Sequence, residues 1–163
     1  MKIGIDIGRV IIGGDTDKPD QFFSKDYLNA TAVENAFESI KKLVDKYGKE
    51  NIYLVSKCGE STQKKTLLWL EHTRFFEITG MHESNVYFCE ERWQKSLICD
   101  EHGINIFIDD RYSVLEHLTN LHQLYLFNPN ESELKRFNQL KDKKHIKLVM
   151  DWKELMGLLK LRI

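Results

Sequence analysis

Two short apolar runs that each end on a carboxylate constrain the fold of this chain more than any other feature. One is residues 104–108, which Asp109 and Asp110 follow, and the other is residues 1–5, which Asp6 follows. Apolar runs of this length, bounded by charge or glycine, are typical of strands buried in a parallel sheet. Ligands bind at the carboxyl ends of such strands, so we expect the three carboxylates to converge at one edge.

The rest of the apolar pattern alternates strands with helices. Strands are predicted over residues 2–7, 51–55, 86–89, 104–108, 123–127 and 145–150. Helices are predicted to begin near residues 31, 61, 91, 111, 130 and 151. This alternation predicts an α/β fold, a three-layer sandwich with a mostly parallel Rossmann-like sheet and helices on both faces.

Several helix starts and packing faces can be predicted residue by residue. Thr31 and Glu34 have the spacing of a capping box, and Asn130 and Asp151 are suited to cap the last two helices. In the helix before residue 104 we expect Trp93 to face the core with its apolar neighbours. The following residues are also expected to pack: Leu67, Leu68, Trp69, Leu70, Leu97, Ile98, Trp152, Phe22, Phe23 and Tyr27.

The length and charge of the chain exclude several classes. We expect residues 1–163 to form one domain, in which residues 8–30, here called the flap, are a loop insertion too short for a large cap domain. The net charge of −1 gives no basis for nonspecific binding to nucleic acid or an anionic membrane. No apolar run approaches the roughly 20 residues of a membrane span.

The cysteines indicate a reducing compartment. Cys58, Cys89 and Cys99 are odd in number and have no CxxC spacing, so we interpret them as reduced thiols of a cytoplasmic protein. For Cys58, which follows the second predicted strand, no base partner is identifiable, and it is interpreted as a packing residue rather than a nucleophile.

The polar residues at the predicted strand ends form a recognisable series. Asp6 follows the first strand, Ser56 the second, Lys95 lies on the helix before the fourth, and Asp109 with Asp110 ends the fourth. In this order they resemble the haloacid dehalogenase-like (HAD) superfamily, of a small-cap or capless, nucleotidase- or phosphatase-like kind. The resemblance extends over residues 2–118.

The resemblance implies a metal-assisted phosphoryl transfer. Asp6 would be the nucleophile, forming an aspartyl-phosphate, and also a ligand of Mg²⁺. The backbone carbonyl of Gly8 would be a second ligand, Asp109 a third, and Asp110 would bind directly or through water. Oxygen ligands suit Mg²⁺, and converging carboxylates repel each other without a cation.

The resemblance also implies a phosphate-binding set. Ser56, with Lys57 and the neighbouring backbone N–H groups, would hold phosphoryl oxygens, and Lys95 would neutralise charge on the transferred group. Lys57, Lys64 and Lys65 compete with Lys95 for this last role.

One departure from the family pattern bears on catalysis. The family phosphatases usually have Asp-x-Asp, whereas this chain has Asp6-Ile7-Gly8, and Gly8 cannot protonate a leaving group or activate water. Asp15, Asp17 or another acid of the flap could substitute, the substrate could have a good leaving group, or the site could bind without turnover.

Two functions from different classes follow. The first is a Mg²⁺-dependent phosphohydrolase or phosphotransferase acting on a phosphate ester, such as a nucleotide or a phosphoprotein, in an open site that homo-oligomerisation could close. The second is a catalytically impaired HAD-like protein that binds a phosphorylated ligand or a protein partner. A third hypothesis uses another resemblance, that of KIGIDIG at residues 2–8 to actin-like sugar kinases and RNase H-like resolvases. The chain has no room for the second domain of those kinases, and it is less basic than a resolvase should be.

Overall fold

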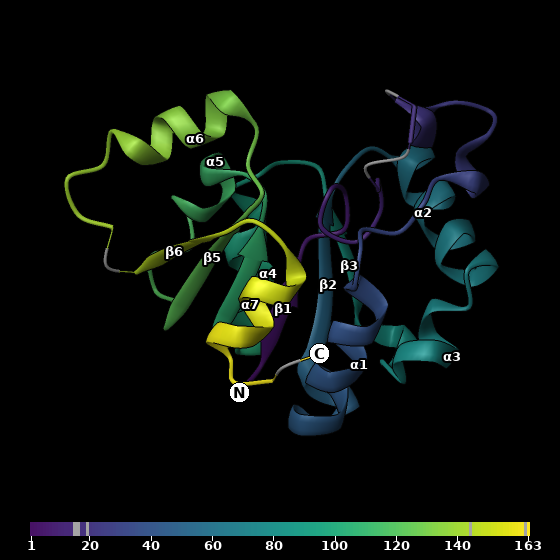
Figure 1. Cartoon of the computed structure of the whole chain (residues 1–163), viewed down its shortest axis with the longest axis horizontal. Helices are drawn as coiled ribbons and strands as arrows, with labels where there is room; N and C mark the ends of the chain where they lie inside the picture. The colour runs from purple at the N-terminus through teal and green to yellow at the C-terminus, as the bar shows by residue number, and fades with distance from the viewer. Residues whose placement is uncertain (15–16, 19, 144, 162) are drawn as a thin grey trace.

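The computed structural model describes residues 1–14, 17, 18, 20–143, 145–161 and 163, and within them six parallel strands form one sheet (Figure 1). The strands are β1 (Ile3–Ile5), β2 (Ile52–Lys57), β3 (Val86–Cys89), β4 (Ile106–Asp109), β5 (Gln123–Phe127) and β6 (Ile146–Val149). Their order is β3-β2-β1-β4-β5-β6, so the chain moves outward in opposite directions from the central pair β1 and β4. Such a reversal opens a crevice at the carboxyl ends of the two strands.

Helices cover both faces of this sheet. They are α1 (Ala36–Tyr47), α2 (Glu60–His72), α3 (Phe75–Thr79), α4 (Gln94–His102), α5 (Tyr112–Leu115), α6 (Glu131–Asn138) and α7 (Trp152–Leu158). Four single turns of 3₁₀-helix accompany them: η1 (Gln21–Phe23), η2 (Tyr27–Asn29), η3 (Lys49–Asn51) and η4 (Glu83–Asn85). The predicted three-layer α/β fold is confirmed.

Alternating side chains along each strand divide the core into two clusters. In β2, Ile52 and Leu54 pack with α1, α2, α3 and α7, whereas Tyr53 and Val55 pack with α4, α5 and α6. The same alternation occurs in β4, where Phe107 faces the second cluster. Because both faces of each central strand are buried, the strands contain few polar residues until their carboxyl ends.

The capping box predicted at Thr31 and Glu34 is wrong, because α1 begins at Ala36. Hydrogen bonds of 2.8–3.0 Å instead join the backbone of residues 31–33 to that of residues 11–14. This pairing closes the base of the flap and holds residues 31–33 in an extended conformation, so the helix can start only after it. The predicted caps at the last two helices are confirmed, since the Asn130 and Asp151 side chains each accept from a backbone N–H.

The predicted packing faces of two helices are wrong in part. Trp93 and Leu97 are about half exposed, whereas Lys95 and Cys99 form the buried side of α4. The inward stripe of α4 is set by Lys95, whose side chain extends toward the sheet edge, and residues two positions away fall on the outside. Leu67 and Leu68 of α2 and Phe23 of the flap are likewise exposed, while Trp69, Leu70 and Trp152 are buried.

None of the helices within the described ranges is long and apolar enough to cross a membrane.

Candidate active site

The register of the two central strands brings Asp6 beside Asp109. Ile5 of β1 is paired with Ile108 of β4, and the Asp6 backbone N–H donates to the Ile108 carbonyl at 2.9 Å. Each carboxylate therefore directly follows, or ends, a buried strand at the same edge of the sheet. The separation of about 100 residues along the chain is removed by the parallel pairing.

Three carboxylates meet at this edge. Asp6, Asp109 and Asp110 each offer an oxygen that lies within 4.8 Å of the other two. Their exposed fractions are only 8, 0 and 4%. Three negative charges this close together and this deeply buried repel each other strongly unless protons or cations compensate them.

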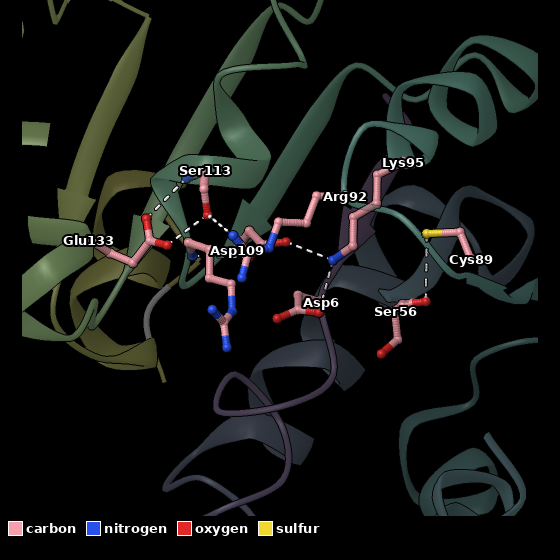
Figure 2. Close-up of polar contacts among 9 residues, drawn as sticks. Asp6, Ser56, Cys89, Arg92, Lys95, Asp109, Ser113 and Glu133 are labelled. Carbon is pink, nitrogen blue, oxygen red and sulfur yellow. Dashed lines mark hydrogen bonds and ion pairs between the residues drawn. The ribbon is translucent and has the colours of Figure 1, made fainter. Parts of the chain in front are cut away.

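Lys95 supplies part of that compensation. Its Nζ donates to Asp6 Oδ1 at 3.0 Å and to Asp109 Oδ2 at 2.8 Å, as Figure 2 shows. The side chain is 1% exposed. Burial acts to lower the pKa of the Lys95 ammonium, but the charges of Asp109 and Asp6 raise it above its ordinary value, so Lys95 stays charged. Three carboxylates and one ammonium leave an excess of negative charge.

That excess raises the pKa of the two carboxyls on β4. Burial, with the charge of Asp6, raises the pKa of Asp109 to about 6 although Lys95 opposes the change. Burial, with the charges of Asp6 and Asp109, raises the pKa of Asp110 to about 9. In the protein without metal, Asp110 is therefore more easily protonated than Asp109.

The fixed contacts of these carboxyls leave ligand positions open. Asp109 Oδ1 accepts from the Arg111 backbone N–H at 3.0 Å, while Asp110 Oδ2 lies 3.7 Å from Arg9 Nε. Asp110 Oδ1 is buried and has no hydrogen-bond donor among the described residues. A buried oxygen without a donor, next to two further carboxylates, is a suitable ligand position for a hard cation.

These residues fit Mg²⁺. All the available side-chain donors are oxygens, and their separation is compatible with one ion bound to all three. Gly8 follows the first carboxylate by two residues, and its exposed backbone lines the same cavity.

The second strand brings the predicted phosphate-binding residues to this edge. Ser56 is buried next to the β1 end, and both Ser56 and the exposed Lys57 line the cavity. Cys58 lines it as well, and burial raises the pKa of its thiol, which does not favour a nucleophilic thiolate.

The structure places the four lysines considered for charge neutralisation at different distances from the carboxylates. Lys95 lies between two of the carboxylates, and Lys57 lies on the cavity wall. Lys64 is exposed and is not among the lining residues, and Lys65 Nζ lies 5.4 Å from the centre of the Tyr27 ring.

The space beside Gly8, where the family phosphatases have their second aspartate, is unobstructed. A Cβ built on Gly8 would meet no atom within 4 Å, so the backbone there has open space for the first atom of a side chain. Asp17 is already used, because its Oδ1 accepts from the Thr31 N–H at 2.9 Å and from the Thr31 hydroxyl at 2.7 Å. Asp15, the other acid considered as a substitute, lies outside the described residues.

A cavity of about 560 Å³ lies over the three carboxylates. The flap forms one wall, where Phe22 and Phe23 of η1 lie, and the loops after β2 and β4 form others. This volume is within the usual range for sites that bind small organic ligands.

A buried hydrogen-bonded chain that the sequence did not suggest adjoins this cavity. Arg92 Nη1 donates to Ser113 Oγ at 3.0 Å, and the Ser113 hydroxyl and backbone N–H donate to the Glu133 carboxylate at 2.6 and 3.0 Å (Figure 2). Its members are 20 or more residues apart in sequence and have no motif spacing, so only their pairing in the fold reveals them.

Comparison with known proteins adds a likeness of fold. No family model matches the chain, and a search of curated proteins found no match either. Among solved structures, the chain is similar to a HAD family hydrolase from Deinococcus radiodurans R1 with bound phosphate and sodium, at 11% identity and a TM-score of 0.59. The alignment covers 98% of this chain and 95% of that one. The two chains share their overall fold.

A de novo designed Rossmann 3x3 protein is also similar, at 12% identity and a TM-score of 0.49 over 98% of this chain and 93% of that one. At these identities the likeness concerns the fold alone. The chemistry of this chain follows from its own residues.

Proposed function

We propose that this chain is a Mg²⁺-dependent phosphohydrolase or phosphotransferase that acts on a phosphate ester through an aspartyl-phosphate at Asp6. The observation that carries the proposal is the convergence of Asp6, Asp109 and Asp110 around Lys95 at the switch point of the sheet. The HAD-like fold, and the order in which these residues follow the strands, support it.

Asp6 is suited to be the nucleophile because one of its carboxylate oxygens is fixed by Lys95. The other can attack the phosphorus atom of a bound ester. The new bond joins Asp6 to phosphorus, the ester P–O bond breaks, and its electron pair leaves with the alcohol oxygen. In a second step, water attacks the phosphorus atom and releases phosphate from Asp6.

The charges of the neighbouring residues support these steps. Lys95 and the Ser56 hydroxyl would offset negative charge on the phosphoryl oxygens without reorganising. Asp6, Asp109 and Asp110, with the Gly8 carbonyl, would hold Mg²⁺, which when bound offsets the carboxylate charge that otherwise repels a phosphate. The cavity would take the rest of the substrate, a phosphorylated small molecule or an exposed part of a larger one.

Substitution of the nucleophile tests the proposal. Asp6→Asn should abolish turnover of a panel of phosphate esters in the presence of Mg²⁺. It should also abolish the mass increase of one phosphoryl group that mass spectrometry detects on the wild-type chain after rapid acid quenching. Asp45→Asn, at an exposed aspartate paired with Lys41, is the matched control and should change neither. Equal activity in the Asp6→Asn variant would refute the nucleophile assignment.

Gly8 favours a second candidate, a protein that binds a phosphorylated ligand or partner and turns over slowly or not at all. The position has no carboxyl group, and Asp17 is held by Thr31 at the base of the flap. A positioned acid or base contributes on the order of 10²–10⁴ in rate. Without one, both the release of the alcohol and the hydrolysis of the aspartyl-phosphate would be slow.

Restoring the acid distinguishes the two candidates. Since a side chain at position 8 meets no obstruction, Gly8→Asp should fold, and Gly8→Asn gives the same shape without the carboxyl. If Gly8→Asp raises turnover by on the order of 10²-fold and Gly8→Asn does not, the natural chain is an impaired enzyme. If the wild type is already fast and neither variant is faster, the binding-protein candidate fails.

A further inference from the structure

Two arginines on the cavity wall lack the carboxylate partners that the other described arginines have. The paired ones are Arg9 with Asp110, Arg74 with Glu77, and Arg136 with Glu116. Within the described ranges, Arg92 and Arg111 form no ion pair, although the charge of Arg111 acts on the Asp110 carboxyl, and both arginines line the cavity over the three aspartates. Two unpaired guanidinium groups in one cavity are suited to bind an anion, because each presents several N–H donors in a fixed plane.

Arg92 is held in place by a chain of hydrogen bonds that fixes the direction of each proton. Glu133 accepts both the hydroxyl proton and the backbone N–H of Ser113. With its proton committed to Glu133, the Ser113 hydroxyl can offer only a lone pair, and Arg92 Nη1 donates to it at 3.0 Å. Figure 2 shows the guanidinium, the hydroxyl and the carboxylate in this order.

The chain is buried where it anchors and half-buried at its cavity end. Ser113 and Glu133 are 3 and 5% exposed, and Asn130 Oδ1 accepts the Glu133 backbone N–H at 2.9 Å. Arg92 is half-buried and lines the cavity. Ser113 therefore links the Arg92 guanidinium to the Glu133 carboxylate without a direct ion pair.

This arrangement leaves most of the Arg92 guanidinium uncommitted. Ser113 occupies one N–H donor, and no other acceptor for this guanidinium occurs among the residues that the structure describes. A side chain whose position is fixed in advance loses little rotamer entropy on binding a ligand.

We propose that Arg92, positioned by Ser113 and Glu133, forms with Arg111 a second anion-binding position in the cavity. The preferred substrates then carry a second oxyanionic group, a phosphate or a carboxylate, besides the phosphoryl group that is transferred. Lys95 lies three residues after Arg92 and contacts Asp6. The two anionic groups of one small molecule would thus lie at two positions of the same cavity. This inference rests on the proposed function.

Three substrates that differ only in the second anion test it. The probes are phenyl phosphate, 4-carboxyphenyl phosphate and 1,4-phenylene bisphosphate, measured with wild type, Arg92→Gln and Arg111→Gln in the presence of Mg²⁺. Each arginine substitution should raise KM by about tenfold or more for the two probes that carry a second anionic group. KM for phenyl phosphate and all kcat values should stay within about twofold, a split that a general loss of structure would not produce.

Further variants separate positioning from charge. Ser113→Ala and Glu133→Gln should reduce the preference for the second anion by a smaller factor than Arg92→Gln. Arg92→Lys, which keeps the charge and loses the planar fork, should restore part of it. Arg74→Gln removes an exposed arginine remote from the cavity lining and should leave every KM unchanged. The carboxylate and bisphosphate probes show which oxyanion the position favours.

Equal KM values for all three probes in the wild type, or equal losses with all three in Arg92→Gln, would overturn the inference and leave the proposed function intact. If no probe is turned over, the proposed function fails instead. Calorimetric binding of 1,4-phenylene bisphosphate and phenyl phosphate then tests the arginine position by itself. A bisphosphate affinity about tenfold lower in Arg92→Gln than in wild type supports it, and an unchanged affinity overturns it.

Discussion

Asp110→Asn should make the protein without metal more stable at high pH. Burial and the neighbouring carboxylates disfavour the ionised form of Asp110 more than that of Asp109. Its pKa is raised from 3.8 to about 9 in the folded protein. Between these values the folded state keeps a proton that the unfolded state has lost, so the free energy of unfolding falls as pH rises. This stabilising contribution is fully present below about pH 4 and is lost as pH rises through about 9.

The size of the effect follows from proton linkage. Between pH 6 and 8 a group protonated only in the folded state lowers the free energy of unfolding by about 1.4 kcal/mol per pH unit, or roughly 3 kcal/mol in all. For a chain of this length that corresponds to roughly 5–10 °C in Tm. Asparagine keeps the shape of the side chain and cannot ionise, so it removes this pH dependence.

Differential scanning fluorimetry in EDTA at pH 5, 6, 7, 8 and 9 measures the effect. The Tm difference between Asp110→Asn and wild type should be small at pH 5 and should grow steadily in favour of the variant up to pH 9. Millimolar Mg²⁺ should raise the Tm of the wild type at pH 8 and have little effect on the variant. A Tm difference that is independent of pH would refute the buried-carboxyl reasoning.

Three further predictions follow from the same contacts. Lys95→Met should lower the free energy of unfolding at pH 7 by about 3–5 kcal/mol in urea titrations, because two buried carboxylates lose their partner; an unchanged midpoint would contradict this. Ser56→Ala should raise KM for phosphate esters by about tenfold at unchanged Tm, and an unchanged KM would remove Ser56 from the phosphate-binding set. Burial raises the pKa of the Cys99 thiol to about 12, so iodoacetamide at pH 8 should alkylate Cys58 first and Cys99 last. Peptide mass spectrometry measures the order of modification, and rapid modification of Cys99 in the folded chain would contradict its burial.

The strands could be predicted from sequence because burial on both faces leaves a direct mark on composition. Residues 86–89 and 123–127 are strands with the predicted ends, and the others differ by one or two residues at each end. The convergence of the three carboxylates could also be predicted, because parallel strands place their carboxyl ends at one edge of the sheet. These are consequences of local pattern and topology.

What could not be predicted depends on contacts between distant residues. The residues at 31–33 have helix-capping spacing, but their backbone pairs with residues 11–14, and this pairing prevents helix formation. The inward side of α4 is set by Lys95, so Trp93, which the apolar pattern places in the core, is half exposed. The chain from Arg92 through Ser113 to Glu133 joins three separate segments and leaves no periodic mark in the sequence.

The most direct test of the central claim is a crystal structure of the protein with Mg²⁺ and BeF₃⁻, a mimic of a phosphoryl group on aspartate. The account predicts BeF₃⁻ bound to an Asp6 oxygen, within reach of Ser56 and Lys95, and Mg²⁺ coordinated by Asp6, the Gly8 carbonyl and the acidic pair at the end of β4. A structure at saturating concentrations in which Asp6 carries no BeF₃⁻, or in which Mg²⁺ binds away from these carboxylates, would contradict it.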